Sequence, residues 1–278
     1  MANANPPETS GHDARYAEIK ASILRSFPFE IIRVPGATAL STWETLKRRP
    51  GIHPIVIGSE DDLFRIAEQQ QSPRREKSDD ILAAAAKYHF PQDLRAGKAR
   101  LQAMIETDRK SDPRFAEAYE AMLRQFPGSA DDFPARGPWP TETPSDAGLS
   151  VAQTATLENE QLITRPSTEV CIALLPIKDW TEAFALLNYG GWNDCPAPEA
   201  HIAAFRHWRG RYQLELVGMS GDVLNLRAAS KPKSREEALA LATEHYEFCP
   251  DTVDQGVDTL ETLAACLMEH DWWYFWWD

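Results

Sequence analysis

The chain opens with short apolar runs that alternate with amphipathic stretches. The β-rich runs at 29–34 (FEIIRV) and 53–58 (HPIVIG) predict two strands, and residues 37–49 between them carry apolar side chains at helical spacing. Ser59 and the acidic residues that follow it suit the N-terminus of a second helix. These elements form a β-α-β-α unit. Because a helix connects its two strands, the strands are expected to pair in parallel.

The middle of the chain changes character twice. Three amphipathic stretches between residues 81 and 126 predict helices, whereas residues 127–148 are rich in Pro, Gly and acidic side chains. Such a segment can neither pair as a central strand nor continue a helix, so residues 129–148 are expected to be exposed and irregular. The predicted organisation is a mobile tail at 1–16, an N-terminal α/β plus helical region at 17–128, a linker at 129–165 and a C-terminal domain at 166–278.

The C-terminal region has the pattern of a further α/β unit. In residues 168–177 (TEVCIALLPI) both alternating sets of side chains are apolar, so a strand here would be apolar on both faces. Such a strand is expected to be covered by helices on both sides. A hairpin turn is expected at residues 220–222 (SGD), and Asp258 with Glu261 matches the capping box of a later helix. The expected class is therefore α/β, with α+β as the alternative, in which helices pack on a mixed sheet.

The last residues, WWYFWWD, are unusually aromatic. As a strand they would place Trp272, Tyr274 and Trp276 on one face and the intervening aromatic residues on the other. An exposed aromatic patch of this size would promote aggregation or mark an interface, so the segment is expected to be largely buried within its own chain. A stacking platform for a base or a sugar is the alternative.

Charge and cysteine content narrow the class of protein. The formal net charge is −13 at pH 7, which disfavours binding to nucleic acid or to an anionic membrane, because those partners require Lys and Arg. The N-terminus lacks the apolar core of a signal peptide, so the four cysteines are expected to be reduced thiols in the cytoplasm. The expected partner is a basic protein or a small molecule.

The densest group of candidate site residues is the stretch at 190–201, GGWNDCPAPEAH. Cys195 precedes a proline at the expected start of a helix, where unpaired backbone N–H groups lower the pKa of a thiol. His201 or His245 would then act as the general base, with Asp194 as a further candidate catalytic residue. The structural alternative is a small apolar cysteine packed beneath a turn that its glycines and prolines shape.

A second group of candidates lies around the helix predicted at 235–248. His245 and Cys249 are four residues apart on one helical face, so with Cys195 and His201 they form one conceivable zinc site. Neither spacing matches a standard zinc motif, so no metal or other cofactor is expected, and core packing is the alternative. The candidate ligand-binding residues are Trp192, Asn193, Cys249, Asp251 and Asp254, and we expect Asn193, Asp194, Cys195, His245, Cys249 and Asp251 to share one cleft.

Four segments of the C-terminal region resemble a known bacterial family. They are LNYGGWNDCPAPEAHIAAFRHW, ELVGMSGDVLNLRAA, REEALALATEHYEFCPDTVDQG and the terminal DWWYFWWD. Together they resemble the family catalogued as domain of unknown function 4253 over residues 166–278. The strand–helix–strand segment near the N-terminus is similar, more weakly, to the front half of longer members. The resemblance implies a domain boundary and an intracellular bacterial setting, and it implies no reaction.

Two functions remain open at this point. The first is a non-enzymatic binding or accessory module, with an immunity-type protein as one form, whose acidic surface meets a basic partner. The second is a small-molecule enzyme that uses Cys195 with His201 or His245, with or without a metal ion. The sequence contains no complete catalytic motif, and its strong net charge suits binding, so the first function is favoured.

Overall fold

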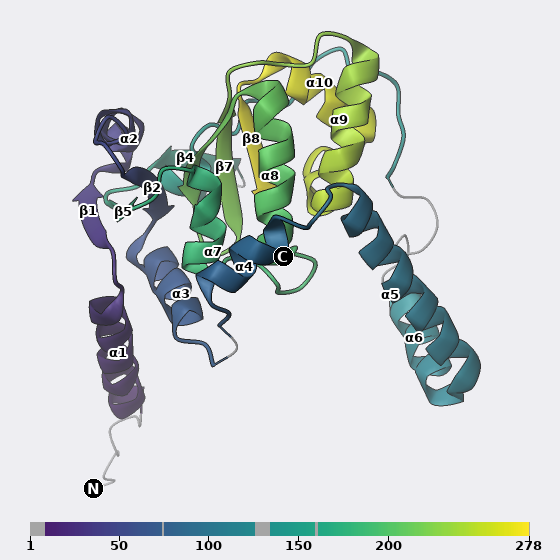
Figure 1. The fold of residues 1–278 in the computed structure, drawn as a ribbon, viewed down its shortest axis with the longest axis horizontal. Coiled ribbons are helices and arrows are strands. Elements are labelled where there is room, and N and C mark those ends of the chain that lie inside the picture. Colours follow the sequence, from purple (N-terminus) through teal and green to yellow (C-terminus); the bar gives the residue numbers. More distant parts are fainter. Residues whose placement is uncertain (1–8, 74, 126–133, 159–160, 278) are drawn as a thin grey trace, which may run out of the picture.

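The computed structural model describes residues 9–73, 75–125, 134–158 and 161–277. Its centre is a mixed six-stranded sheet with the strand order β1-β5-β2-β6-β7-β8 (Figure 1). Helices pack on the sheet, which confirms the predicted α/β class. The strands are β1 (Glu30–Val34), β2 (His53–Gly58), β3 (Gln153–Glu158), β4 (Gln161–Pro166), β5 (Val170–Leu175), β6 (Leu214–Met219), β7 (Val223–Ala228) and β8 (Trp272–Trp276).

The core has two layers, one on each face of the sheet. Alternate side chains of β5 divide between them: Cys171 and Ala173 join the larger cluster, beneath α8 and α9, and Ile172 joins the smaller cluster, which includes Trp43 of α2. The strand is therefore covered on both faces, as its sequence predicts. The helices are α1 (Thr9–Ser26), α2 (Ala39–Leu46), α3 (Glu60–Gln70), α4 (Ser78–Ala85), α5 (Gln92–Ser111), α6 (Pro113–Gln125), α7 (Ala183–Leu187), α8 (Pro198–Tyr212), α9 (Arg235–Phe248) and α10 (Leu260–Glu269), with short helices η1 (Gly36–Thr38), η2 (Ser150–Ala152) and η3 (Trp180–Glu182) and the π-helix η4 (Thr252–Val257).

The pairing of the first two strands differs from the prediction. β1 and β2 run in the same direction, as expected, but each pairs with β5 in antiparallel fashion and β5 lies between them. The expected parallel pairing of β1 with β2 is therefore wrong, whereas β2 does pair in parallel with β6. Every residue of β5 is buried, and a strand that is apolar on both faces is stabilised most in the interior of a sheet.

Residues 134–148 are irregular, as expected, but they are not all exposed. Arg136 Nε donates to Glu261 Oε1 of α10 over 2.7 Å, and Trp139 packs against the larger core cluster. The prediction of an exposed segment is wrong for this part, because burial of an aromatic ring and an ion pair hold it against α10. Residues 129–133, to which the same prediction applies, lie outside the described residues.

Three elements extend the main layers. Residues 9–16, which the sequence places in a mobile tail, form the start of α1. Helices α5 and α6 form a hairpin that projects from the body of the molecule (Figure 1). Strands β3 and β4, which fall largely within the predicted linker, pair with each other as a separate antiparallel hairpin.

Helix caps follow the sequence signals only in part. Ser59 caps α3 as predicted: its Oγ accepts the Asp62 N–H over 3.2 Å, and Asp62 Oδ2 accepts the Ser59 N–H over 2.9 Å. For α10 the cap is Thr259 and not Asp258, because the Thr259 hydroxyl accepts a backbone N–H of the first turn. The expected partner in that capping box, Glu261, binds Arg136 instead.

Candidate functional site

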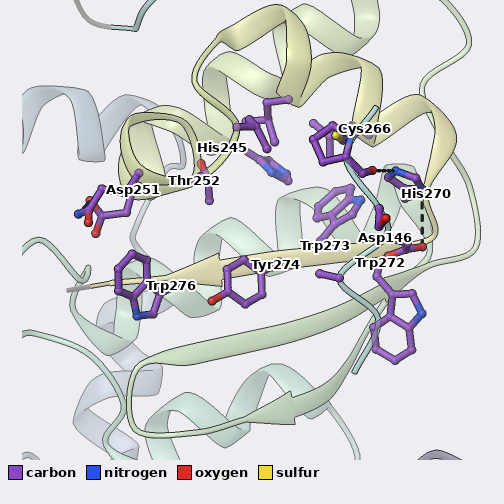
Figure 2. Close-up of a pocket in the computed structure, with 18 residues that line it drawn as sticks. Asp146, His245, Asp251, Thr252, Cys266, His270, Trp272, Trp273, Tyr274 and Trp276 are labelled. Atoms are coloured by element: carbon purple, nitrogen blue, oxygen red, sulfur yellow. Dashed lines mark hydrogen bonds and ion pairs between the residues drawn. The ribbon is translucent and has the colours of Figure 1, made fainter. Parts of the chain in front are cut away.

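A cavity of about 390 Å³ lies along the outer edge of β8 (Figure 2). Its walls come from β8, from the C-terminal end of α9, from η4 and α10, and from residues 144–147. Pockets that hold small ligands have volumes of about 300–1,000 Å³, so this cavity is large enough to be one. Four aromatic side chains of β8 line it, namely Trp272, Trp273, Tyr274 and Trp276.

β8 has the two-residue alternation that its sequence predicts. Its odd-numbered aromatic side chains, together with the following residue Trp277, pack beneath α8 and α9, and Trp273 and Phe275 are at most 2 % exposed. Its even-numbered aromatic side chains are less buried, and Tyr274 is 37 % exposed. The expected burial therefore holds for one face, whereas the other face remains partly accessible beside the cavity.

His245, near the end of α9, is a buried polar residue that lines this cavity. Its ring lies among aromatic rings, with centroids 4.5 Å from Trp273, 4.8 Å from Trp208 and 4.8 Å from Phe275. Burial lowers the pKa of His245 to about 3, so the imidazole is neutral at pH 7. Its Nε2 is buried and has no hydrogen-bond partner among the described residues.

A carboxylate stands at each end of the cavity, as Figure 2 shows for Asp251 and Asp146. Asp251 precedes η4, and its Oδ1 accepts a hydrogen bond from Gln255 Nε2 over 3.0 Å. Asp146 Oδ2 lies 3.8 Å from Nδ1 of His270, which follows α10. Each end of the cavity thus carries a carboxylate, and the wall between them is aromatic.

Cys195 and His201 form a separate buried pair. The Cys195 thiol lies 3.8 Å from His201 Nε2, and His201 Nδ1 donates to the Ala197 carbonyl over 3.2 Å. That second bond assigns the proton to Nδ1, so Nε2 accepts from the thiol. The imidazole is enclosed by aromatic rings, including a stacked contact with Phe184 at 5.0 Å and an edge contact with Phe248 at 5.1 Å.

This pair lacks the electrostatics of an activated nucleophile. Cys195 is 4 % exposed, and burial raises the pKa of its thiol instead of lowering it. Burial also lowers the pKa of His201 to about 3, so the imidazole does not become the cation that would stabilise a thiolate. The expected low thiol pKa is wrong, because loss of hydration outweighs the nearby start of α8.

The turn before Cys195 has structural reasons for its composition. Gly190 has φ of 113°, and a Cβ there would lie 2.1 Å from the Pro196 carbonyl oxygen, so glycine is required. Asn193 has φ of 44°, a left-handed conformation that asparagine tolerates better than most residues. Asp194 is exposed on this turn. These residues do not line the cavity beside β8.

The remaining candidates divide between the core and the cavity rim. Trp192 packs edge-on against Tyr189, with ring centroids 4.9 Å apart, beneath the same turn. Cys249 donates its thiol hydrogen to the Trp276 carbonyl over 3.0 Å, and burial raises its pKa to about 12. Asp254 accepts a hydrogen bond from the Tyr246 hydroxyl over 3.3 Å. Of the six residues expected to share one cleft, the cavity beside β8 brings together only His245 and Asp251.

Sequence reasoning missed the other side of the site. Asp146 lies in the Pro-rich segment and His270 follows α10, and no sequence signal connects residues so far apart. Cys266, on the cavity side of α10, was likewise not a candidate. Within the described part of the chain, no three His, Cys, Asp or Glu side chains are grouped so that they could hold a metal ion. The zinc set suggested by spacing is therefore not assembled.

Comparison with known proteins supports the family resemblance and adds no activity. Residues 171–278 match the model of the family described as domain of unknown function (DUF4253), which confirms the identification of the C-terminal region. No curated protein and no solved structure matched the chain. None of the described helices combines the length and the apolar character needed to cross a membrane.

Proposed function

We propose that the protein is a non-enzymatic binding module that holds its ligand in the cavity beside β8. The observation that carries this proposal is the unpartnered His245 Nε2 on a side chain that lines the cavity, considering the described residues. A buried polar atom without a partner costs about 1–3 kcal/mol. A ligand that completes this hydrogen bond would offset the cost, whereas packing alone would favour an apolar residue at this position.

Charge supports a ligand with basic groups. Asp146 and Asp251 lie at the two ends of the cavity, and the chain as a whole carries a net charge of −13. Opposite charge steers a partner toward its site and selects against partners of like charge. A basic protein segment or a basic small molecule fits this surface, as in an accessory or immunity-type protein.

The contact between Cys195 and His201 favours a second candidate function, a small-molecule enzyme. The two side chains are arranged like a nucleophile and its general base, because the thiol points at the acceptor nitrogen of the imidazole. Such a reaction requires an ionised and accessible thiol, whereas burial raises the pKa of Cys195 and leaves little of it exposed. The enzyme therefore ranks second.

Ligand-observed NMR with three aromatic fragments of similar size tests the binding function. Phenethylamine is positively charged, 2-phenylethanol is neutral and phenylacetate is negatively charged. We expect phenethylamine to bind most tightly, because it combines an aromatic ring with a cation. His245→Leu and Asp251→Asn should each weaken it by about fivefold or more, the worth of one hydrogen bond or ion pair. Asp79→Asn, an exposed position on α4, makes the same change in net charge and serves as the matched control.

The same titration separates the two candidate functions. Cys195→Ser should leave the affinity for phenethylamine within about twofold, because the thiol does not line the cavity. Absence of binding by any of the fragments, or equal effects of Asp251→Asn and Asp79→Asn, would contradict the proposed cavity. Turnover of a small molecule that disappears in Cys195→Ser would favour the enzyme instead.

A further inference from the structure

β8 is an edge strand whose backbone alternates between β7 and the cavity. The Ala228 N–H donates to the Asp271 carbonyl over 2.7 Å, and the Trp277 N–H donates to the Asp222 carbonyl over 3.2 Å. These bonds mark the odd-numbered residues of this segment as the hydrogen-bonded pairs with β7. The backbone N–H and C=O groups of Trp272, Tyr274 and Trp276 therefore point away from β7, toward the cavity that these residues line.

Most of these outward backbone groups have no hydrogen-bond partner among the described residues. Cys249 donates its thiol hydrogen to the Trp276 carbonyl. For Trp272 and Tyr274, no residue in the described part of the chain is hydrogen-bonded to the outward N–H or C=O. A row of unpaired backbone donors and acceptors beside a cavity is the arrangement that a further strand can use.

The opposite edge strand of the sheet carries charged side chains, whereas β8 carries none. At β1, Arg33 forms ion pairs with Glu169 at 3.0 Å and with Glu60 at 2.7 Å. Charged side chains at an edge hinder pairing with another chain. β8 consists only of aromatic residues, without a charge or a proline. β8 therefore lacks the charged side chains that hinder strand pairing at β1.

We infer that the β8 edge accepts an extended peptide segment with basic side chains, which adds a seventh strand to the sheet and fills the cavity. This inference rests on the binding function proposed above and names the class of its ligand. Main-chain hydrogen bonds to Trp272 and Tyr274 hold the segment. The basic side chains of the segment form ion pairs with Asp146 and Asp251. Another of its side chains enters the cavity toward His245.

Charge decides between a basic segment and a second copy of this chain. Two copies paired through β8 would bring the carboxylates around the cavity of one copy toward those of the other, and like charges at an interface are unfavourable. A segment rich in Lys or Arg makes the opposite contacts. A stable dimer of the protein through β8 is thus an outcome that would overturn the inference.

Backbone methylation of a peptide tests strand pairing directly. The probe is a fluorescently labelled seven-residue peptide of alternating lysine and valine, with affinity measured by fluorescence anisotropy. Two derivatives carry N-methyl groups on all lysines or on all valines, so that each blocks the N–H groups on one edge of the extended peptide. We expect one derivative to bind at least about tenfold more weakly, because it loses several hydrogen bonds, and the other to bind within about twofold of the parent.

Variants of the protein test the same contact from the other side. Tyr274→Pro removes an outward N–H and leaves the ladder with β7 intact, a position where an edge strand tolerates proline. We expect it to weaken the peptide by about tenfold, whereas Tyr274→Phe, which keeps the backbone N–H, should change the affinity less than twofold. If Tyr274→Pro does not fold, the methylated peptides still decide the question.

The outcomes separate this inference from the proposed function. Fragment binding at the cavity without any peptide binding would overturn strand pairing and leave the proposed function intact. The same conclusion would follow if His245→Leu abolished peptide binding while the two methylated derivatives bound with equal affinity. Strand pairing would then be overturned and the proposed function left intact. Failure of both the fragments and the peptide would overturn both. A parent peptide that binds no more tightly than a glutamate–valine peptide would overturn the basic character of the ligand.

Discussion

Two buried histidines pack against aromatic rings of the larger core cluster, but they differ in whether their ring nitrogens have hydrogen-bond partners. His201 and His245 are 0 % and 1 % exposed, both lie among aromatic rings, and burial lowers the pKa of each to about 3. His201 uses both ring nitrogens, on the Ala197 carbonyl and the Cys195 thiol. His245 lines a cavity, and its Nε2 has no partner in the part of the chain that the structure describes.

The difference teaches that burial and a shifted pKa do not by themselves mark a functional histidine. Both properties follow from an aromatic environment that excludes water. What distinguishes the two residues is the remaining hydrogen-bonding capacity and the empty space beside it. His201 completes the structure around the turn at Cys195, whereas His245 keeps a buried ring nitrogen without a hydrogen-bond partner among the described residues.

The largest expected effect is the shared response to pH. In the unfolded chain a histidine has a pKa near 6.5, above the folded value of about 3, so the unfolded state binds more protons between these values. Stability is therefore present above pH 6.5 and is lost as the pH falls. From pH 7 to pH 5 the free energy of unfolding should drop by about 2 kcal/mol for each histidine, about 4 kcal/mol in all. Urea unfolding at several pH values measures it.

That pH response can be assigned to the two sites by substitution. His201→Leu and His245→Leu should each remove about half of the loss in stability between pH 7 and pH 5. An unchanged pH dependence in either variant would mean that the histidine concerned is not held neutral in the folded protein.

The next effect is a loss of stability in His201→Leu. The substitution leaves the buried Cys195 thiol without its acceptor, whereas the Ala197 carbonyl still accepts the backbone N–H groups of Ala200 and residue 201. We expect the free energy of unfolding at pH 7 to fall by about 1–3 kcal/mol. Thermal unfolding followed by circular dichroism measures the change, and the parent protein at the same pH is the reference.

His245→Leu should act in the opposite direction. It removes a buried nitrogen that has no partner among the described residues and replaces it with apolar volume. Without ligand, the variant is expected to be more stable than the parent at pH 7 by about 1 kcal/mol, with binding weakened. A destabilisation as large as that of His201→Leu would show that His245 is a structural residue and would remove the contrast.

The smallest effect concerns the thiols near the two histidines. Cys266 is only partly buried, lines the cavity and has a pKa raised to about 11, whereas Cys195 is buried and its pKa is raised further. Iodoacetamide at pH 8 should therefore modify Cys266 first, and bound ligand should slow that reaction. Mass spectrometry after timed quenching gives the order. Faster modification of Cys195 would favour the enzyme.

Much of the fold could be predicted from local pattern. β2 and β8, the hairpin between β6 and β7, and the cap of α3 by Ser59 all lie where the sequence places them, because each depends on side-chain periodicity or on turn residues nearby. The order of strands could not be predicted in this way. β5 lies between β1 and β2 because long-range burial decides which strand takes the interior position.

The candidate site was only partly accessible to sequence reasoning. His245 and Asp251 were candidates because a histidine on a helical face and an acid after a Cys-Pro pair stand out locally. Asn193 and Cys195 stood out for the same kind of reason, yet the structure explains one by its left-handed backbone and the other by burial. Residue type and spacing therefore identify unusual residues, but they do not show whether such a residue shapes a tight turn or belongs to a binding site.

The sequence by itself determined the α/β class, the resemblance of the C-terminal region to a domain family of unknown function and the alternation of the terminal aromatic strand, because these follow from residue types at short spacing. Only the tertiary structure decided that this strand lies at the edge of the sheet. It also brought Asp146 and His270 together beside β8 and left His245 Nε2 unpartnered within the described residues. Those features depend on contacts between residues far apart in the chain, and such contacts form where burial and hydrogen bonding of the whole molecule are satisfied together.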